Sequence, residues 1–207
     1  MRPIDPIPVR LIAGALLLAT TSAAPDQRPA TMNLIGPDQK PAVEKSIAEL
    51  RAASPAQAAT TNRAVVTLVG NQHSIASVRG FGVVQDEPAS VAGGATGPTP
   101  TDYFIAALGT CQNVVLVRYA ALEQIAVEEL ETTVTGTWDR RGLYGLLGID
   151  PGFQEIAIET RVSTPATAEK VAELVRRTRR SCPIFATLRR ETSLTVRLIV
   201  NGKAVPL

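Results

Sequence analysis

The chain has 207 residues, of which 45% are hydrophobic and 19% are charged, and its formal net charge at pH 7 is +2. This length and composition can bury one sizeable core. A charge so close to zero argues against a dedicated nucleic-acid surface, which usually carries a strong basic excess. One His and two Cys exclude a conventional zinc finger or a His-rich metal centre. We therefore expect a single domain with no metal, no cofactor and no nucleic-acid partner.

The N-terminus has the layout of a secretory signal peptide. Residues 1–24 combine two arginines with an apolar stretch, Leu11–Thr20, and a run of small residues. The apolar stretch is too short to span a bilayer. A start of translation at Met32 is the alternative, and we treat residues 1–38 as an N-terminal extension. A cytoplasmic location is expected, whereas a genuine signal peptide would place the protein in the periplasm or outside the cell.

The next segment predicts a helix followed by a hairpin. Apolar residues at helical spacing in Ala42–Ala53 indicate an amphipathic surface helix, so we assign residues 39–62 to a helix and linker. Arg63–Val69 and Ser77–Gln85 are predicted strands, joined by a segment with turn-forming residues. Asp86–Pro100 is rich in Gly and Pro and is predicted to be a loop.

A long helix is predicted at the centre of the chain, over Pro100–Leu122. Thr99 suits the N-cap, and Asp102, three residues later, can reach back to the free amides of the first turn. The helix is apolar on nearly every face, so we expect it to be enclosed by the domain. Its polar residues at the middle, with Arg118 near the end, favour a buried core helix over a membrane span.

The remaining elements predict the fold class. Leu130–Trp138 and Phe153–Val162 alternate with the period of half-buried strands. A second helix is expected over residues 164–183, and Leu194–Val200 alternates as a last strand. The order ββαββαβ with hairpin connections predicts an α+β domain with antiparallel sheets, which we place at residues 63–207.

The two cysteines are the candidate reactive groups. Cys111 lies inside the predicted core helix, and Cys182 directly precedes a proline at the end of the second helix. A nucleophilic thiol and its resolving partner would explain both positions. Two inert residues would explain them as well, because free cysteine is among the most buried residue types.

Three segments carry a resemblance to a known family. They are DEPASVAGGATGPTPTDYFIAALGTC (86–111), SCPIFATL (181–188), and the loop WDRRGLYG with GFQEI after it. Together with the order of elements they resemble the OsmC/Ohr family of organic hydroperoxide reductases and its relatives, over roughly Arg63 to Gly202. The resemblance implies antiparallel sheets wrapped around long buried central helices, in an intertwined homodimer with sites at the subunit interface.

The resemblance also implies a chemistry for the cysteines. Cys111 matches the peroxidatic cysteine, whose thiolate attacks an organic hydroperoxide and becomes a sulfenic acid. Cys182 matches the resolving cysteine, which forms a disulfide with it, and an external dithiol then reduces the pair. The two residues are 71 positions apart, 182 minus 111, so only tertiary folding can bring them together. Their Cα atoms must approach within about 7 Å.

The chain departs from the family at the groups that activate the thiolate. A glutamate early in the central helix is replaced by Thr101, and the turn expected to carry an arginine reads Gly70-Asn71-Gln72-His73. Arg118, seven residues after Cys111 on the same helical face, and Arg79, in the second predicted strand, are the candidate substitutes. Asp102 is the adjacent acid, although capping of the helix explains it equally well.

We therefore expect a thiol-dependent peroxidase for organic hydroperoxides, active in the oxidative stress response, with no membrane partner. The alternative is a non-catalytic OsmC-like protein that binds a small hydrophobic ligand at the dimer interface and has lost the activating pair. A third hypothesis is an exported domain stapled by a permanent disulfide between the cysteines, which would persist in an oxidising compartment.

Overall fold

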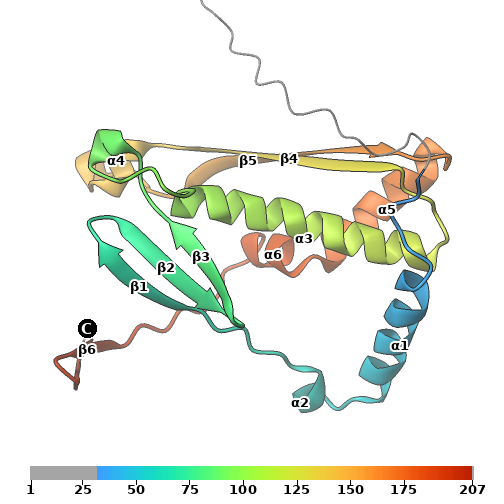
Figure 1. Cartoon of the computed structure of the whole chain (residues 1–207), viewed down its shortest axis with the longest axis horizontal. Coiled ribbons are helices and arrows are strands. Elements are labelled where there is room, and N and C mark those ends of the chain that lie inside the picture. Colours follow the sequence, from blue (N-terminus) through green and yellow to red (C-terminus); the bar gives the residue numbers. More distant parts are fainter. Residues whose placement is uncertain (1–31, 207) are drawn as a thin grey trace, which may run out of the picture. The chain divides into compact units, whose positions relative to one another are not determined.

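The computed structural model describes residues 32–206. The predicted signal peptide at residues 1–24 lies outside the described residues. In the described part, one long helix, α3 (Pro100–Leu122), packs against the longest strand pair and three other helices (Figure 1).

The helix α3 begins where the sequence predicts, because its N-cap forms the expected hydrogen bonds. The Thr99 hydroxyl accepts the backbone N–H of Asp102 at 3.3 Å, and the Asp102 carboxylate accepts the backbone N–H of Thr99 at 2.9 Å. This reciprocal pair satisfies two of the amides that a helix N-terminus leaves free. The capping role of Asp102 is therefore confirmed.

The expectation that α3 is enclosed on nearly every face is wrong. By length and composition the helix could cross a membrane. Here one side of it packs against β4, α5, α6 and α1, and residues such as Leu108 and Leu116 are buried there. The other side is open: the side chains of Phe104 and Val114 are 38% and 51% exposed. The elements of a single chain cover only part of this apolar helix.

A long antiparallel hairpin covers one side of α3. It consists of β4 (Glu129–Trp138) and β5 (Phe153–Ser163), paired from Glu129↔Ser163 to Trp138↔Phe153 with a register shift at its far end. Burial alternates along β4, as the period-two pattern predicts. The short helices α4 (Arg140–Leu143) and η2 (Leu146–Gly148) connect the strands.

Two helices on the C-terminal side bring the second cysteine to α3. The helix α5 (Ala168–Ser181) begins after the N-cap Thr167, three residues later than predicted from Thr164. It ends at Ser181, because Cys182, the residue before a proline, is driven out of the helical conformation. A short helix, α6 (Pro183–Leu188), follows. Leu174 of α5 joins the buried core cluster, which also contains Leu116, Ala120, Ile125 and Val127.

The segment before α3 contains one strand more than predicted. After α1 (Gln39–Ala52) and α2 (Pro55–Ala58) come β1 (Val65–Gly70), β2 (His73–Val78) and β3 (Phe81–Gln85), in an antiparallel sheet of that order. The predicted strand Ser77–Gln85 is interrupted at Arg79 and Gly80, which have φ angles of 51° and 86°. Glycine adopts such angles without strain, so a tight turn forms there.

The C-terminal strand also differs from its prediction. Leu194 and Val196 lie before the strand and are exposed, and a small hairpin of β6 (Leu198–Val200) and β7 (Lys203–Val205) follows. The described order is thus βββαββαββ when only the long helices α3 and α5 are counted between the strands. The predicted class, α+β with antiparallel sheets, is confirmed.

Candidate active site

The two cysteine sulfurs meet where α3 passes the junction of α5 and α6. Cys111 Sγ and Cys182 Sγ are 2.6 Å apart in an S–H···S contact, and both residues are free thiols. Cys182 is fully buried and Cys111 is half-buried. The Cys182 sulfur also accepts the backbone N–H of Phe185 at 3.5 Å, so it caps the first turn of α6. A small movement of either side chain would allow a disulfide to form.

The environment of Cys111 keeps it protonated. Burial, the main cause, and the hydrogen bond with Cys182 together raise the pKa of its thiol to about 11. The backbone N–H of Ile184 and the positive charge of Arg118 act in the opposite direction. These two groups favour the thiolate, but they do not outweigh burial and the neighbouring thiol.

The structure separates the two candidate arginines. Arg118 is close enough to Cys111 to lower its pKa, as its position on the same face of α3 predicts. Arg79 lies in the exposed turn between β2 and β3, and it is not among the groups that act on the Cys111 thiol. Within one chain, Arg118 is therefore the candidate cation for the thiolate, and Arg79 is not.

Thr101 lies in a cavity at the N-terminal end of α3, away from the thiols. Ten residues of helix separate it from Cys111, which corresponds to about 15 Å along the axis. Its hydroxyl is 2.9 Å from the hydroxyl of Thr99. The cavity has a volume of about 440 Å³, and Gln72, from the turn in which the family arginine was expected, lines it as well. The two departures from the family pattern thus occur in one place.

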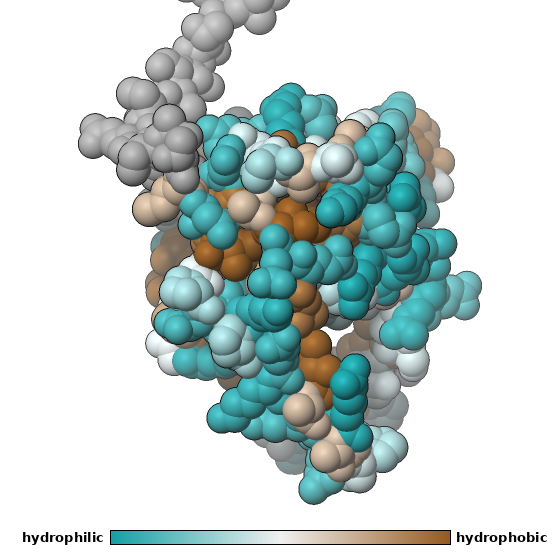
Figure 2. Space-filling view, turned by 90° about the vertical axis from the view of Figure 1, so that its right-hand side faces the viewer, coloured by the Kyte–Doolittle hydropathy of each residue, from teal (hydrophilic) through white to brown (hydrophobic). Residues whose placement is uncertain are grey.

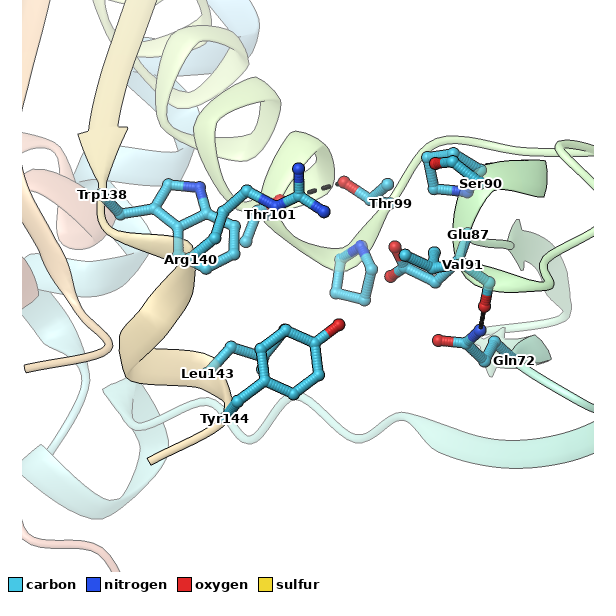
Figure 3. Close-up of a pocket in the computed structure, with 12 residues that line it drawn as sticks. Gln72, Glu87, Ser90, Val91, Thr99, Thr101, Trp138, Arg140, Leu143 and Tyr144 are labelled. Carbon is cyan, nitrogen blue, oxygen red and sulfur yellow. Dashed lines mark hydrogen bonds between the residues drawn. The ribbon is translucent and has the colours of Figure 1, made fainter. Parts of the chain in front are cut away.

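Two charged residues that the sequence did not single out also line this cavity. Figure 3 shows the guanidinium of Arg140 and the carboxylate of Glu87 on opposite sides of it, with the hydroxyl of Tyr144 between them. Arg140 is the first residue of α4, after β4, and Glu87 lies in the loop after β3. No spacing in the sequence connects them, because the residues are 53 positions apart, 140 minus 87, and meet only through packing.

The glycine-rich loop beside this cavity is organised by one buried carboxylate. Asp86, 1% exposed, accepts the backbone N–H groups of Glu87, Gly94 and Thr96 and the hydroxyl of Thr96. These hydrogen bonds, led by the Thr96 hydroxyl, hold the pKa of Asp86 far below its usual range. The carboxylate thus ties the predicted loop into a defined turn.

Within residues 32–206 no group of three or more His, Cys, Asp or Glu side chains is placed to hold a metal ion.

The fold and the thiol pair define the class of the protein: an antiparallel α+β domain with a cysteine in its central helix and a second cysteine packed against it. A family model described as OsmC-like protein matches residues 93–197, which is half of the chain. The chain belongs to the OsmC-like family. A search of curated proteins found no match.

Solved structures of this family share the fold. An OsmC-like protein from Mycoplasma pneumoniae is 20% identical with a TM-score of 0.55, over 63% of this chain and 88% of that one. An OsmC-like protein of unknown function from Vibrio cholerae is 14% identical with a TM-score of 0.53, over 62% and 94%. A putative osmotic stress induced and detoxification response protein from Psychrobacter arcticus is 15% identical with a TM-score of 0.52, over 62% and 89%.

Proposed function

We propose that this protein is a thiol-dependent peroxidase that reduces organic hydroperoxides. The observation that carries the proposal is the approach of Cys111 Sγ to Cys182 Sγ, at 2.6 Å, from residues 71 positions apart. The unequal burial of the pair suits two different roles. Cys111, half-buried, is reachable by a small substrate, whereas Cys182 is enclosed and can meet only the neighbouring sulfur.

The reaction has two steps on the protein. The Cys111 thiolate attacks the distal oxygen of the hydroperoxide, the O–O bond breaks, and the alkoxide takes a proton and leaves as an alcohol. Cys111 is then a sulfenic acid. The Cys182 sulfur attacks it, water leaves, and a disulfide forms. An external dithiol supplies two electrons and two protons to restore both thiols.

The raised pKa of Cys111 limits the first step, because only the thiolate is nucleophilic. Arg118 and the Ile184 N–H are the groups in this chain that favour the thiolate. Aliphatic residues are frequent in α3 and α6, the two helices that meet at the thiol pair, so an alkyl hydroperoxide fits the site better than hydrogen peroxide.

The test is the consumption of cumene hydroperoxide by the purified full chain with dithiothreitol as reductant. We expect turnover in the wild type and none in Cys111→Ser. Cys182→Ser should accumulate a sulfenic acid on Cys111, which mass spectrometry after trapping with dimedone detects. Wild-type consumption no faster than that of Cys111→Ser, with both thiols reduced, would refute the proposal.

A non-catalytic binding protein is the second candidate. The raised pKa of Cys111 favours it, because burial and the neighbouring thiol outweigh the positive charge of Arg118. It predicts that both thiols stay reduced after exposure to excess hydroperoxide, whereas a peroxidase would convert them to the disulfide.

We also propose that the functional unit is a homodimer. Large apolar side chains are exposed on the β1–β3 sheet, on the open side of α3 and near the C-terminus, among them Leu68, Phe81, Val114 and Leu194. Exposed apolar surface of this extent is typical of an interface. Size-exclusion chromatography with light scattering should give twice the mass of the 21.9 kDa chain. A monomer would contradict the proposal.

A further inference from the structure

A second cavity lies between α1 and the C-terminal half of α3, away from the cavity of Figure 3. Figure 2 shows the side of the molecule on which α1 lies, where hydrophobic surface is exposed in a furrow between hydrophilic borders. The cavity has a volume of about 360 Å³, which is within the range of small-molecule sites.

One wall of this α1–α3 groove is the apolar face of α1. Val43, Ile47 and Leu50 line it at spacings of four and three residues, which places them on one side of the helix. None of the residues of α1 is fully buried. The face therefore rests against α3 without merging into the core, and a cavity remains between the helices. Because α1 lies before the matched residues 93–197, this wall is outside the region that defines the family.

The opposite wall comes from α3 and carries a positive charge. Val115 and Leu122 are its apolar members, and Arg118 between them is the one charged side chain among the described residues that line the cavity. Arg118 forms no ion pair with the other described residues, whereas Arg177, on α5, pairs with Glu123. Tyr119 donates its hydroxyl proton to Ser181 at 2.6 Å and so closes the end of the groove that adjoins α5.

The side chains of these walls favour a ligand that has both an apolar part and an anionic part. Aliphatic side chains on both helices favour a hydrocarbon chain, and burying such a chain releases about 0.8 kcal/mol for each CH₂ group. An unpaired guanidinium favours a carboxylate, with which it forms charge-assisted hydrogen bonds. A neutral hydrocarbon would leave this cation without a partner, and a hydrophilic anion would leave the apolar walls exposed.

We infer that the α1–α3 groove binds a monocarboxylic acid with an aliphatic chain, with the carboxylate on Arg118 and the chain against Val43, Ile47 and Leu50. This site does not depend on the proposed peroxidase activity. The groove lies on the same helix as the candidate nucleophile: Arg118 is seven residues, or about 10 Å, along α3 from Cys111. Ser181, which lines the groove, directly precedes Cys182. The groove is therefore built on the same helices, α3 and α5, that lead to the thiol pair.

The test is calorimetric titration of the reduced full chain with decanoate and, separately, with decanol as the uncharged probe. We expect one decanoate per chain in the wild type. Decanol should bind the wild type about tenfold to a hundredfold more weakly than decanoate does, because it lacks the charge-assisted contact. Decanoate should bind Arg118→Gln more weakly by a similar factor, for the same reason. Ile47→Trp, which fills the groove, should abolish binding. Arg190→Gln removes an exposed arginine that does not line the groove and should leave the affinity unchanged.

Three outcomes would overturn the inference. One is the absence of decanoate binding to the wild type. Another is equal affinity for decanoate in the wild type and Arg118→Gln. The third is that no decanoate binds while Ile47→Trp changes the oligomeric state in light scattering, which would assign the groove to a second copy of the chain. None of these results depends on peroxide turnover, so failure of the site and failure of the proposed enzyme are distinguishable.

Discussion

Replacing Cys182 by alanine should make Cys111 more reactive towards an alkylating agent at neutral pH. In the wild type the pKa of Cys111 is raised to about 11. Burial is the main cause, and the hydrogen bond with the thiol of Cys182 is the next largest. At pH 7 a thiol with that pKa is ionised in roughly one molecule in 10⁴, whereas an ordinary cysteine, with a pKa of about 8.5, is ionised in about one in thirty. Removal of the neighbouring thiol should move Cys111 part of the way between these limits.

The expected gain in alkylation rate is about tenfold for each pH unit by which the pKa falls, and its ceiling is about 300-fold, the ratio of the two limits. The assay is the rate of carbamidomethylation of Cys111 by iodoacetamide as a function of pH, followed by mass spectrometry of the intact chain. Desolvation remains in the variant, so its pKa should stay above that of an ordinary thiol.

Two further variants control this experiment. Cys182→Ser keeps a small side chain that can cap α6, so it separates loss of the thiol from loss of the cap. Arg118→Gln should shift the alkylation profile in the opposite direction, towards higher pH, because it removes a charge that favours the thiolate. A wild-type midpoint near pH 8.5, or a midpoint that Cys182→Ala leaves unchanged, would refute the reasoning.

Two other predictions concern stability. In the reduced protein, the free energy of unfolding of the wild type should fall relative to that of Cys111→Ala as the pH rises from about 8.5 towards 11. The reason is that the Cys111 thiol loses its proton at a lower pH in the unfolded chain than in the folded one. Denaturant titrations of both proteins across this range measure it, and a constant difference would contradict it. Gly93→Ala should lower the stability by about 1–3 kcal/mol, since its Cβ would lie 1.8 Å from the carbonyl oxygen of Glu87. Gly36→Ala, which meets no atom within 4 Å, is the control, and equal melting temperatures of the two variants would exclude this clash.

Much of the secondary structure follows from short-range chemistry, and the sequence predicted it. Thr99 and Asp102 cap α3 through atoms three residues apart. Pro183 ends α5 through its own ring. The alternation of β4 and β5 reflects which side of the hairpin is buried. Each of these signals lies within a few residues of the feature it determines.

The missed turn between β2 and β3 shows where such signals become ambiguous. Arg79 and Gly80 sit inside a run of residues that favours an extended strand. A single glycine in a strand pattern is compatible with a bulge, a turn or an uninterrupted strand. The pairing of β3 with β2 decides among them, and that pairing depends on the fit of side chains from both strands.

The sequence by itself determined the helices α1 and α3, the end of α5, the hairpin β4–β5, the fold class and the two candidate thiols, because periodicity, caps and prolines act locally. Only the tertiary structure decided the contact between Cys111 and Cys182, the burial that raises the Cys111 pKa and the groove between α1 and α3. It also placed Asp86 at the centre of its loop and brought Glu87 and Arg140 to one cavity. These features arise between residues far apart in the chain, and their distances and desolvation follow from how the elements pack.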